Sequence, residues 1–297
     1  MTSSPNAAAA GQITLGGDLK VNRLGFGAMR ITGPGVWGPP PDVAAALKVV
    51  QRAVQLGANF IDTADSYGPE VSENLIAQAL HPYPADLVIA TKAGLVRPGP
   101  DVWNRNADPK HLRSACEGSL RRLRRDRIDV FQLHAPDPRV PFADSVGELV
   151  RLQNDGKIRH IALSNVSLQE LKQAERLTPI VSVQNRFNLE DRRSDAVLEY
   201  CATKAIAFIP WAPLDSGRHA QRSMPPLGIS SLNARSRALA RIAERHEVSV
   251  GAVAIAWLLK HSPAMLPIPG TGSVKHLEEN VAAASMELNA EDLKELS

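Results

Sequence analysis

Four ionisable side chains stand at or just after the ends of short apolar runs, and together they could move a proton. Asp62 ends one run, Tyr67 follows it five positions later, Lys92 ends a second run and His134 ends a third. A tyrosine hydroxyl has a reference pKa of about 10, and a neighbouring lysine ammonium lowers that pKa by favouring the phenolate. An aspartate would balance the charge of a buried lysine, and a neutral histidine can hold a substrate oxygen by a hydrogen bond. The set predicts a tyrosine that acts as a general acid toward a carbonyl oxygen.

Each of the four residues alone also has an ordinary structural interpretation. Asp62 could cap the following turn, and Lys92 could extend from its strand into solvent. His134 could be a satisfied core histidine, and Tyr67 could be an aromatic residue packed in its loop. Their arrival together on adjacent strand ends is what favours the catalytic interpretation, because active sites gather ionisable groups that perturb one another.

The elements that must position these residues form a repeating unit of an apolar strand followed by a helix. Continuous apolar runs, rather than alternating ones, are typical of strands covered on both faces. Eight core strands are expected to end near Met29, Asp62, Lys92, His134, Leu163, Gln184, Trp211 and Ile268. Helical periodicity is expected over residues 42–56, 71–80, 108–123, 141–154, 168–177, 194–204, 235–244, 250–260 and 275–284.

Eight such units predict an α/β protein, a closed (β/α)8 TIM barrel. An N-terminal β-hairpin is expected before it, with strands at residues 13–15 and 19–21. A doubly wound open sheet is the competing architecture, but it usually carries a GxGxxG turn that leads directly from an early strand into a helix. The GxGxxG match in this sequence, at residues 33–38, lies instead in a loop rich in glycine and proline. In a barrel the side chains at the carboxyl ends of the strands meet over one face, so the site is expected there.

Composition and charge exclude several classes of function. The net charge of +3 over 297 residues implies no nucleic-acid partner, and no apolar run reaches the roughly 18 residues that a membrane helix needs. Cys116 and Cys201 are far apart and lack CxxC spacing, which argues against a disulfide framework and a metal site. Residues 1–11 are expected to be a disordered tail, residues 12–297 a single domain, and the protein cytoplasmic.

Several longer stretches carry more specific combinations of residues. They are residues 60–68 (FIDTADSYG) with Glu73 and Asn74, residues 119–123 (SLRRL) and 128–134 (IDVFQLH), residues 156–159 (GKIR) through 164–166 (SNV), residues 183–188 (VQNRFN), and residues 267–271 (PIPGT) with Glu278, Glu279 and Asn280. In this order and at this spacing they resemble the aldo-keto reductase family, from about Gln12 to the C-terminus.

The resemblance implies a reaction in which a nicotinamide cofactor delivers hydride to an aldehyde or ketone while Tyr67 protonates the oxygen. Lys92 and Asp62 would tune Tyr67, and His134 would orient the carbonyl. The expected partner is a small-molecule aldehyde or ketone, and the expected assembly is a monomer or a small homo-oligomer. The alternative is a cofactor-binding regulatory or sensor subunit with little turnover, resembling channel-associated relatives. The complete set of four residues favours the enzyme.

The same resemblance implies a set of cofactor-binding residues along the strand ends. They are Gly27, Ala28, Met29, Ser164, Asn165, Gln184, Trp211, Leu214, Ser216, Gly217, Gly270, Thr271, Ser273, Lys275, Glu279 and Asn280. The expected cofactor is NADP(H), whose adenosine phosphate would lie near a helix N-terminus at residues 269–275. NAD(H) stays open, because residues 270–273 are uncharged where members that prefer NADP usually carry a lysine or arginine.

Two tryptophans, Trp37 and Trp103, lie in long expected loops that open onto the catalytic face. Both are candidates to line an apolar substrate pocket, and packing under a loop is the equal alternative. The chain ends soon after the last expected helix, so we expect an open pocket that accepts small aldehydes and ketones. Residues 217–234 lack clear periodicity, and we expect either a flap over the cofactor or disorder.

Overall fold

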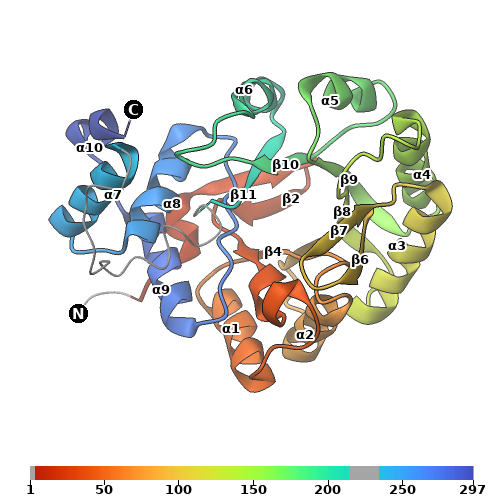
Figure 1. Ribbon diagram of the computed structural model, residues 1–297, viewed down its shortest axis with the longest axis horizontal. Coiled ribbons are helices and arrows are strands. Elements are labelled where there is room, and N and C mark those ends of the chain that lie inside the picture. The colour runs from red at the N-terminus through yellow and green to blue at the C-terminus, as the bar shows by residue number, and fades with distance from the viewer. Residues whose placement is uncertain (1–3, 214–233, 297) are drawn as a thin grey trace.

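The computed structural model describes residues 4–213 and 234–296, and its centre is a parallel sheet surrounded by helices (Figure 1). The strand order is β11-β10-β9-β8-β5-β4-β3, so parallel strands that follow one another in this series along the chain also pair in space. The strands are β3 (Phe26–Gly27), β4 (Phe60–Asp62), β5 (Val88–Ala93), β8 (Ile128–Leu133), β9 (Ile158–Ser164), β10 (Ser182–Arg186) and β11 (Ala207–Trp211).

An extended segment at residues 265–268 closes this sheet between its two edge strands. On one side the amide of Leu266 donates to the carbonyl of Phe208 at 2.9 Å, and on the other the amide of Gly25 donates to the carbonyl of Pro267 at 3.0 Å. Pro267 and Pro269 have no N–H group to contribute, so this segment cannot form a regular ladder of hydrogen bonds. The barrel predicted from the sequence is confirmed, with an eighth strand that is extended but irregular.

Helices cover the outer face of the barrel, and several begin at a side chain that accepts from an early backbone amide. Asp42 accepts from the amide of Ala45 at the start of α1. The helices are α1 (Val43–Gln55), α2 (Val71–Leu80), α3 (Pro109–Leu123), α4 (Phe142–Asn154), α5 (Leu168–Glu175), α6 (Asp195–Lys204), α7 (Ala234–Arg245), α8 (Val250–His261), α9 (Val274–Ala282) and α10 (Ala290–Glu295).

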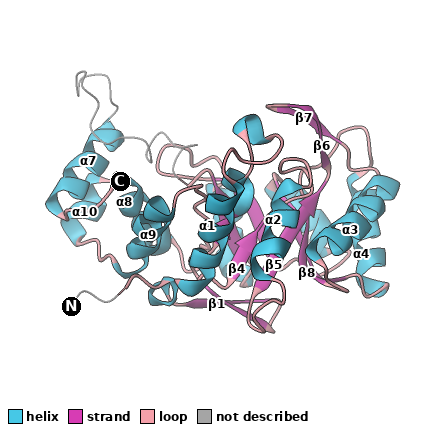
Figure 2. Cartoon of the chain, turned by 90° about the horizontal axis from the view of Figure 1, so that it is seen from below, coloured by secondary structure: helices cyan, strands magenta, loops and turns pink. Residues whose placement is uncertain are grey.

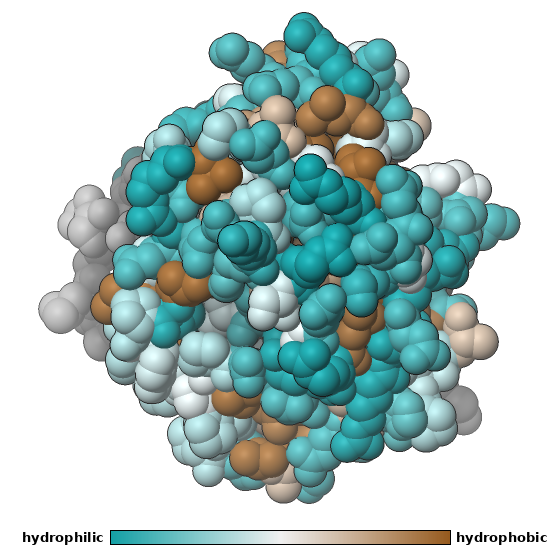
Figure 3. All heavy atoms as spheres, turned by 90° about the vertical axis from the view of Figure 1, so that its right-hand side faces the viewer, coloured by the Kyte–Doolittle hydropathy of each residue, from teal (hydrophilic) through white to brown (hydrophobic). Residues whose placement is uncertain are grey.

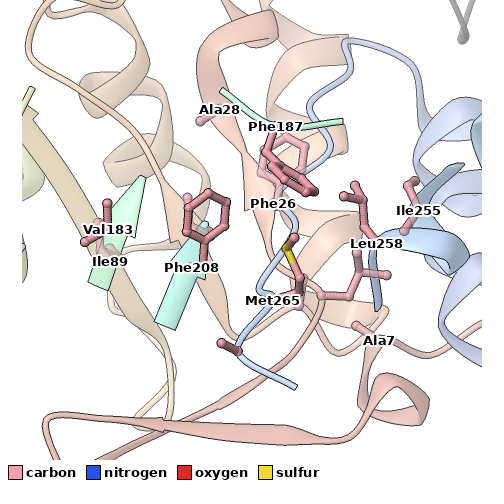
Figure 4. Close-up of a cluster of buried hydrophobic side chains, with 14 of the residues drawn as sticks. Ala7, Phe26, Ala28, Ile89, Val183, Phe187, Phe208, Ile255, Leu258 and Met265 are labelled. Carbon is pink, nitrogen blue, oxygen red and sulfur yellow. The ribbon is translucent and has the colours of Figure 1, made fainter. Parts of the chain in front are cut away.

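A large apolar layer fills the space between the strands and these helices. Figure 4 shows part of it, where Phe26, Phe208 and Met265 lie with Ile255 and Leu258 of α8. All five side chains are almost completely buried. The layer fixes the outward-facing side of each strand, and the opposite side is therefore turned into the barrel.

A second, smaller apolar layer fills the barrel interior and is closed from below by the N-terminal hairpin. This hairpin, β1 (Gln12–Leu15) and β2 (Leu19–Asn22), is present as predicted. Its residues Leu15, Leu19 and Val21 are buried in the interior layer. The floor of the barrel is thus apolar, and polar chemistry is confined to the other end.

The expected disordered tail at residues 1–11 is wrong for the residues that the structure describes. Ala7–Ala10 form a 3-10 helix, and the side chain of Asn6 accepts from the amide of Ala8 at its start. Ala7 is fully buried, and its amide donates to the carbonyl of Leu56 at 2.8 Å. The small alanine side chain is what lets this turn lie against the end of α1.

A second hairpin follows β5, where the sequence analysis expected a loop. Its strands β6 (Leu95–Gly99) and β7 (Val102–Arg105) pair antiparallel with a shift of register. Pro98, Gly99 and Pro100 interrupt any alternation of apolar and polar residues, which is why the strands are hard to recognise in the sequence. Figure 2 shows this hairpin at the end of the barrel opposite β1.

The surface carries scattered apolar residues. On the face shown in Figure 3 they form small, separate groups on a mostly hydrophilic background. Within residues 4–213 and 234–296, no helix is long and apolar enough to span a membrane. The same residues contain no group of His, Cys, Asp or Glu side chains arranged to hold a metal ion.

Candidate active site

The two-residue period of the strands aims the candidate catalytic side chains into the barrel. Phe60 packs in the interior layer, and Asp62, two positions later, faces the same way. Along β5, Val88 and Ala90 also pack in the interior, and Lys92 continues that face. Both strands therefore contribute apolar side chains to the interior and carry a polar one at the open face.

Lys92 and Asp62 form a buried ion pair under this open face. The Lys92 Nζ lies 2.7 Å from the Asp62 Oδ2, and the exposed fractions of the two side chains are 0% and 2%. The Asp62 Oδ1 accepts from the side-chain amides of Gln132 and Gln184, both at 2.9 Å. Burial lowers the pKa of Lys92, but the charges of Asp62 and Tyr67 and the hydrogen bonds to both together offset this, and the net pKa is raised. Lys92 therefore stays protonated.

The same ammonium group contacts the hydroxyl of Tyr67. Nζ donates to the Tyr67 Oη at 3.3 Å and to the carbonyl of Thr63 at 2.7 Å. Together with the bond to Asp62, these contacts use the three protons of the ammonium group. Because the Tyr67 oxygen accepts from Lys92, its own proton is left to donate to a ligand.

Lys92 lowers the pKa of Tyr67 as expected, but burial outweighs this effect. Burial raises the pKa of Tyr67, the charge of Lys92 lowers it, and the charge of Asp62 raises it again, so the net pKa lies above the ordinary value. Burial dominates because the phenolate loses its hydration. The hydroxyl therefore keeps its proton at neutral pH, as a proton donor must.

His134 follows β8 directly and borders the same site. Its ring is nearly perpendicular to that of Tyr67, with centroids 5.9 Å apart. Its Nδ1 lies 3.3 Å from the Oγ of Ser66, which leaves Nε2 as the nitrogen available to a ligand. Burial lowers the pKa of His134 well below its usual value, and the charge of Lys92 lowers it further. The imidazole ring is therefore neutral.

Asp62, Tyr67 and His134 line a cavity of about 570 Å³, and Lys92 lies behind them. Ligand sites in proteins typically occupy about 300–1,000 Å³. The predicted residues that line the cavity are Gly27, Met29, Asp62, Tyr67, Trp103, His134, Ser164, Asn165, Gln184, Trp211, Gly270 and Thr271. Pro269 and Gly272 also line the cavity and belong to the segment 269–275 that was predicted to lie near the adenosine phosphate. Lining residues that were not predicted from the sequence are Arg30, Leu95, Ala212, Pro213, Ile268 and His276.

Other predicted residues lie elsewhere. Among the described residues, those that do not line the cavity are Ala28, Trp37, Ser273, Lys275, Glu279 and Asn280. Trp37 forms a backbone bridge with Gly68, and its ring lies 6.0 Å from the guanidinium carbon of Arg97, so the expectation that it lines the pocket is not met. Leu214, Ser216, Gly217 and the rest of the stretch up to residue 233 lie outside the described residues.

The sequence profile of the Aldo/keto reductase family matches residues 23–297. The chain belongs to this family. An uncharacterized oxidoreductase of Schizosaccharomyces pombe is 49% identical over 290 residues, which cover 98% of this chain and 90% of the relative. Pyridoxine 4-dehydrogenase of Escherichia coli is 39% identical over 286 residues, covering 94% and 95%. The solved structure of a glycerol dehydrogenase from Gluconobacter oxydans matches with a TM-score of 0.84 and 28% identity, covering 97% of this chain and 94% of that one.

In this aldo/keto reductase, polar and aromatic groups beside His134 fit the nicotinamide end of a cofactor. Asn165 has a left-handed backbone, with φ of 57°. Its side-chain amide donates to the carbonyl of His134 at 2.9 Å, and its oxygen accepts from the indole N–H of Trp211 at 3.0 Å. Trp211 is thereby held in the cavity wall, where its ring can stack on a flat heterocycle. Ser164 and Gln184 add polar atoms to the same wall.

A second group of lining residues carries side chains that could hold a phosphate group. Gly270 and Gly272 pack against the backbone of residues 27–30, so the last strand and the end of the first are neighbours. Arg30 and His276 line the cavity beside Thr271. Arg30 thus places a positive charge near the segment where the sequence analysis found none after the last strand. In the sequence, Arg30 could have been noticed because it directly follows Met29, a predicted cofactor-binding residue. Its proximity to residues 270–272 becomes visible only in the closed barrel.

Proposed function

We propose that this chain is a nicotinamide-dependent oxidoreductase that reduces an aldehyde or ketone to an alcohol, with Tyr67 as the general acid. The observation that carries the proposal is the Tyr67 hydroxyl, which borders the cavity and accepts a hydrogen bond from Lys92 at 3.3 Å. Residues 12–297 would act as one domain, because the hairpin floor and the closing segment share one interior layer.

Proton delivery is the task of Tyr67. The bound cofactor supplies hydride for the carbonyl carbon. As negative charge grows on the carbonyl oxygen, Tyr67 donates its proton to that oxygen, and the phenolate that forms is stabilised by the Lys92 ammonium. Asp62 keeps Lys92 charged through the 2.7 Å ion pair. The three residues therefore form a chain in which each one sets the protonation of the next.

Orientation of the substrate is the task of His134. A neutral imidazole that carries its proton on Nε2 can donate a hydrogen bond to the carbonyl oxygen without competing as an acid. The hydroxyl of Ser66 supports this tautomer if it donates to Nδ1, from which it is 3.3 Å away. Ser66 would then be as important for geometry as the histidine itself.

The cofactor we propose is NADP(H). Arg30 and His276 in the cavity wall support it, since a guanidinium and an imidazole can both hold a phosphate. The N-terminus of α9 lies in the same stretch of chain, where Ser273 caps the helix. A helix N-terminus favours bound anions.

The proposed substrates are small aldehydes and ketones. The relative from Escherichia coli is named for pyridoxine and the structural neighbour from Gluconobacter oxydans for glycerol. Pyridoxal and glyceraldehyde therefore belong in a substrate panel with simple aliphatic and aromatic aldehydes. The cavity of about 570 Å³ has to hold the nicotinamide end of the cofactor as well, which favours compact substrates.

The test is the decay of NADPH absorbance with this panel, for the wild-type protein and for Tyr67→Phe. We expect turnover by the wild type and a loss of about 10²- to 10⁴-fold in Tyr67→Phe. Cofactor affinity, measured by fluorescence titration, should be nearly the same in both proteins. Tight NADPH binding without turnover on any carbonyl compound would instead support the cofactor-sensing alternative.

A further inference from the structure

Three aromatic rings meet at a corner of the cavity. The Trp103 ring lies 6.3 Å from the rings of both Tyr67 and His134, measured between centroids. The interplanar angles among the three rings are 83°, 81° and 74°, so each ring meets the other two edge-on. A carbonyl substrate that reaches Tyr67 and His134 must therefore fit beside the indole of Trp103.

Trp103 reaches this corner from an element with little apolar packing of its own. It belongs to β7 of the β6–β7 hairpin, whose other residues are half-buried or exposed except for Arg97. Val102, the neighbour of Trp103, is 48% exposed. Apolar packing within the hairpin therefore cannot account for the position of the indole.

Arg97 supplies what the hairpin lacks. The residue is 8% exposed, and its guanidinium carbon lies 3.7 Å from the centroid of the Trp103 ring. Within the hairpin, Nε donates to the carbonyl of Val102 at 2.8 Å, and Nη2 donates to that of Gly99 at 3.4 Å. The guanidinium plane is thus locked against the strand that carries the indole.

The guanidinium of Arg97 also donates hydrogen bonds to the two neighbouring loops. Nη2 donates to the carbonyl of Gly35 at 2.7 Å, and Nη1 donates to that of Val36 at 2.9 Å. Nη1 donates in addition to the carbonyl of Ser66 at 3.3 Å, one residue before Tyr67. One side chain therefore ties the Trp103 hairpin to the loop after β3 and to the segment that carries the proton donor.

We propose that Arg97 is a positioning residue that holds the indole of Trp103 as a fixed wall of the substrate site and so sets which carbonyl compounds fit. The role requires arginine, because a planar fork can stack on a ring while it donates to several carbonyl groups at once. A lysine would keep the charge but lose both the stacking plane and the fork. The effect on substrate choice rests on the proposed carbonyl reduction. The holding of the Trp103 indole by Arg97 does not depend on that function.

The experiment uses Arg97→Met and Arg97→Lys in the full chain, with Arg125→Met as a matched control. Arg125 also stacks on an aromatic ring, that of Tyr83 at 4.5 Å, and donates to a carbonyl, that of Leu87, but neither contact borders the cavity. Hydrogen exchange of the amides in residues 95–105 is the first measurement. We expect exchange to be at least about tenfold faster in both Arg97 variants and unchanged in the control.

The second measurement compares KM and kcat for 1-naphthaldehyde and propanal. Loss of the wall should raise KM for the bulky ring about tenfold and leave KM for propanal within about twofold, with little change in kcat. Trp103→Phe and the double variant Arg97→Met/Trp103→Phe complete a double-mutant cycle. In the Trp103→Phe background, Arg97→Met should hardly change KM for 1-naphthaldehyde, because the indole is no longer present. A circular dichroism spectrum checks folding, and Arg97→Lys carries the test if Arg97→Met does not fold.

The outcomes separate this inference from the proposed function. Unchanged exchange in residues 95–105 overturns the positioning role of Arg97, whatever the activity. Faster exchange with equal losses on both aldehydes, or with additive effects in the cycle, overturns its role in selecting substrates. Absence of turnover in the wild type contradicts the proposed function, while the exchange measurement still decides whether Arg97 holds the wall.

Discussion

The Lys92 Nζ and the Asp62 Oδ2 lie 2.7 Å apart beneath the cavity and join β5 to β4 through a pair of opposite charges with almost no exposure. Water cannot replace either partner. Removal of one charge therefore affects both the stability of the barrel and the chemistry above it, and a second substitution is needed to tell these effects apart.

We expect Lys92→Met to abolish carbonyl reduction while cofactor binding stays nearly intact. Because Asp62 would be left as an uncompensated buried charge, the free energy of unfolding should fall by about 3–5 kcal/mol. Urea unfolding and NADPH titration measure the two effects. Lys92→Met combined with Asp62→Asn should regain much of the stability and none of the activity. Near-normal turnover in Lys92→Met would remove the proposed role of Lys92.

The pH dependence of reduction tests the state of His134. Burial and the charge of Lys92 hold the pKa of His134 well below its usual value, so the ring stays neutral throughout the neutral range. We expect kcat/KM to show no acid limb from this residue between about pH 8 and about pH 6. His134→Gln should be slower with the same profile. A limb near about pH 6.5 that disappears in His134→Gln would contradict a neutral ring.

Asp65 should make stability depend on pH. Its buried Oδ1 has no hydrogen-bond partner among the described residues. Burial raises its pKa to about 8, the charge of Glu73 raises it further, and Arg122 and Ser66 oppose the shift. Since the unfolded pKa is about 3.9, the folded state binds more protons between about pH 4 and about pH 8, and stability falls as pH rises through that window.

The variant Asp65→Asn removes this titration and keeps the shape of the side chain. In urea unfolding, its stability relative to the wild type should therefore increase by about 1.4 kcal/mol per pH unit across the window. Titrating groups that do not interact with Asp65 cancel in the difference between the two proteins. A difference that does not change with pH would show that Asp65 ionises in the folded protein much as it does in the unfolded one.

Arg30 should decide which nucleotide binds. We expect Arg30→Ala to weaken NADPH about tenfold or more, as for a lost charge-assisted hydrogen bond to phosphate, and to leave NADH within about twofold. Arg30→Lys should retain part of the preference. Lys275→Ala is the matched control, because Lys275 lies in the same region but outside the cavity wall. Equal losses for both nucleotides in Arg30→Ala would count against a phosphate contact.

The order of strands and helices could be predicted because each apolar run and each helical period follows from local sequence. The ends of β4, β5 and β8 then placed Asp62, Lys92 and His134 on one face, as the two-residue period requires. Local sequence does not show how deeply a side chain is buried. The net pKa of Tyr67 could not be predicted for that reason, since the charge of Lys92 is visible in the sequence and the loss of hydration is not.

The features missed in the sequence depend on contacts between distant segments. Arg30 gains its place from residues 270–272, far along the chain, which pack beside it when the barrel closes. Arg97 stands in a stretch rich in proline and glycine, and nothing in its local sequence marks it as important. Its importance comes from the carbonyl groups of three separate segments, which converge on one guanidinium.

The apolar floor made by Leu15, Leu19 and Val21 affects the order in which ligands can bind to the barrel and leave it. Within the described residues, apolar side chains fill that end of the barrel, so two ligands would both enter and leave at the opposite end. Whichever is seated deeper has to arrive first and depart last. If the nicotinamide ring lies against the strand ends with the carbonyl compound above it, the nucleotide can be exchanged only after the alcohol has left. Release of the ligands would then limit the rate of the whole catalytic cycle.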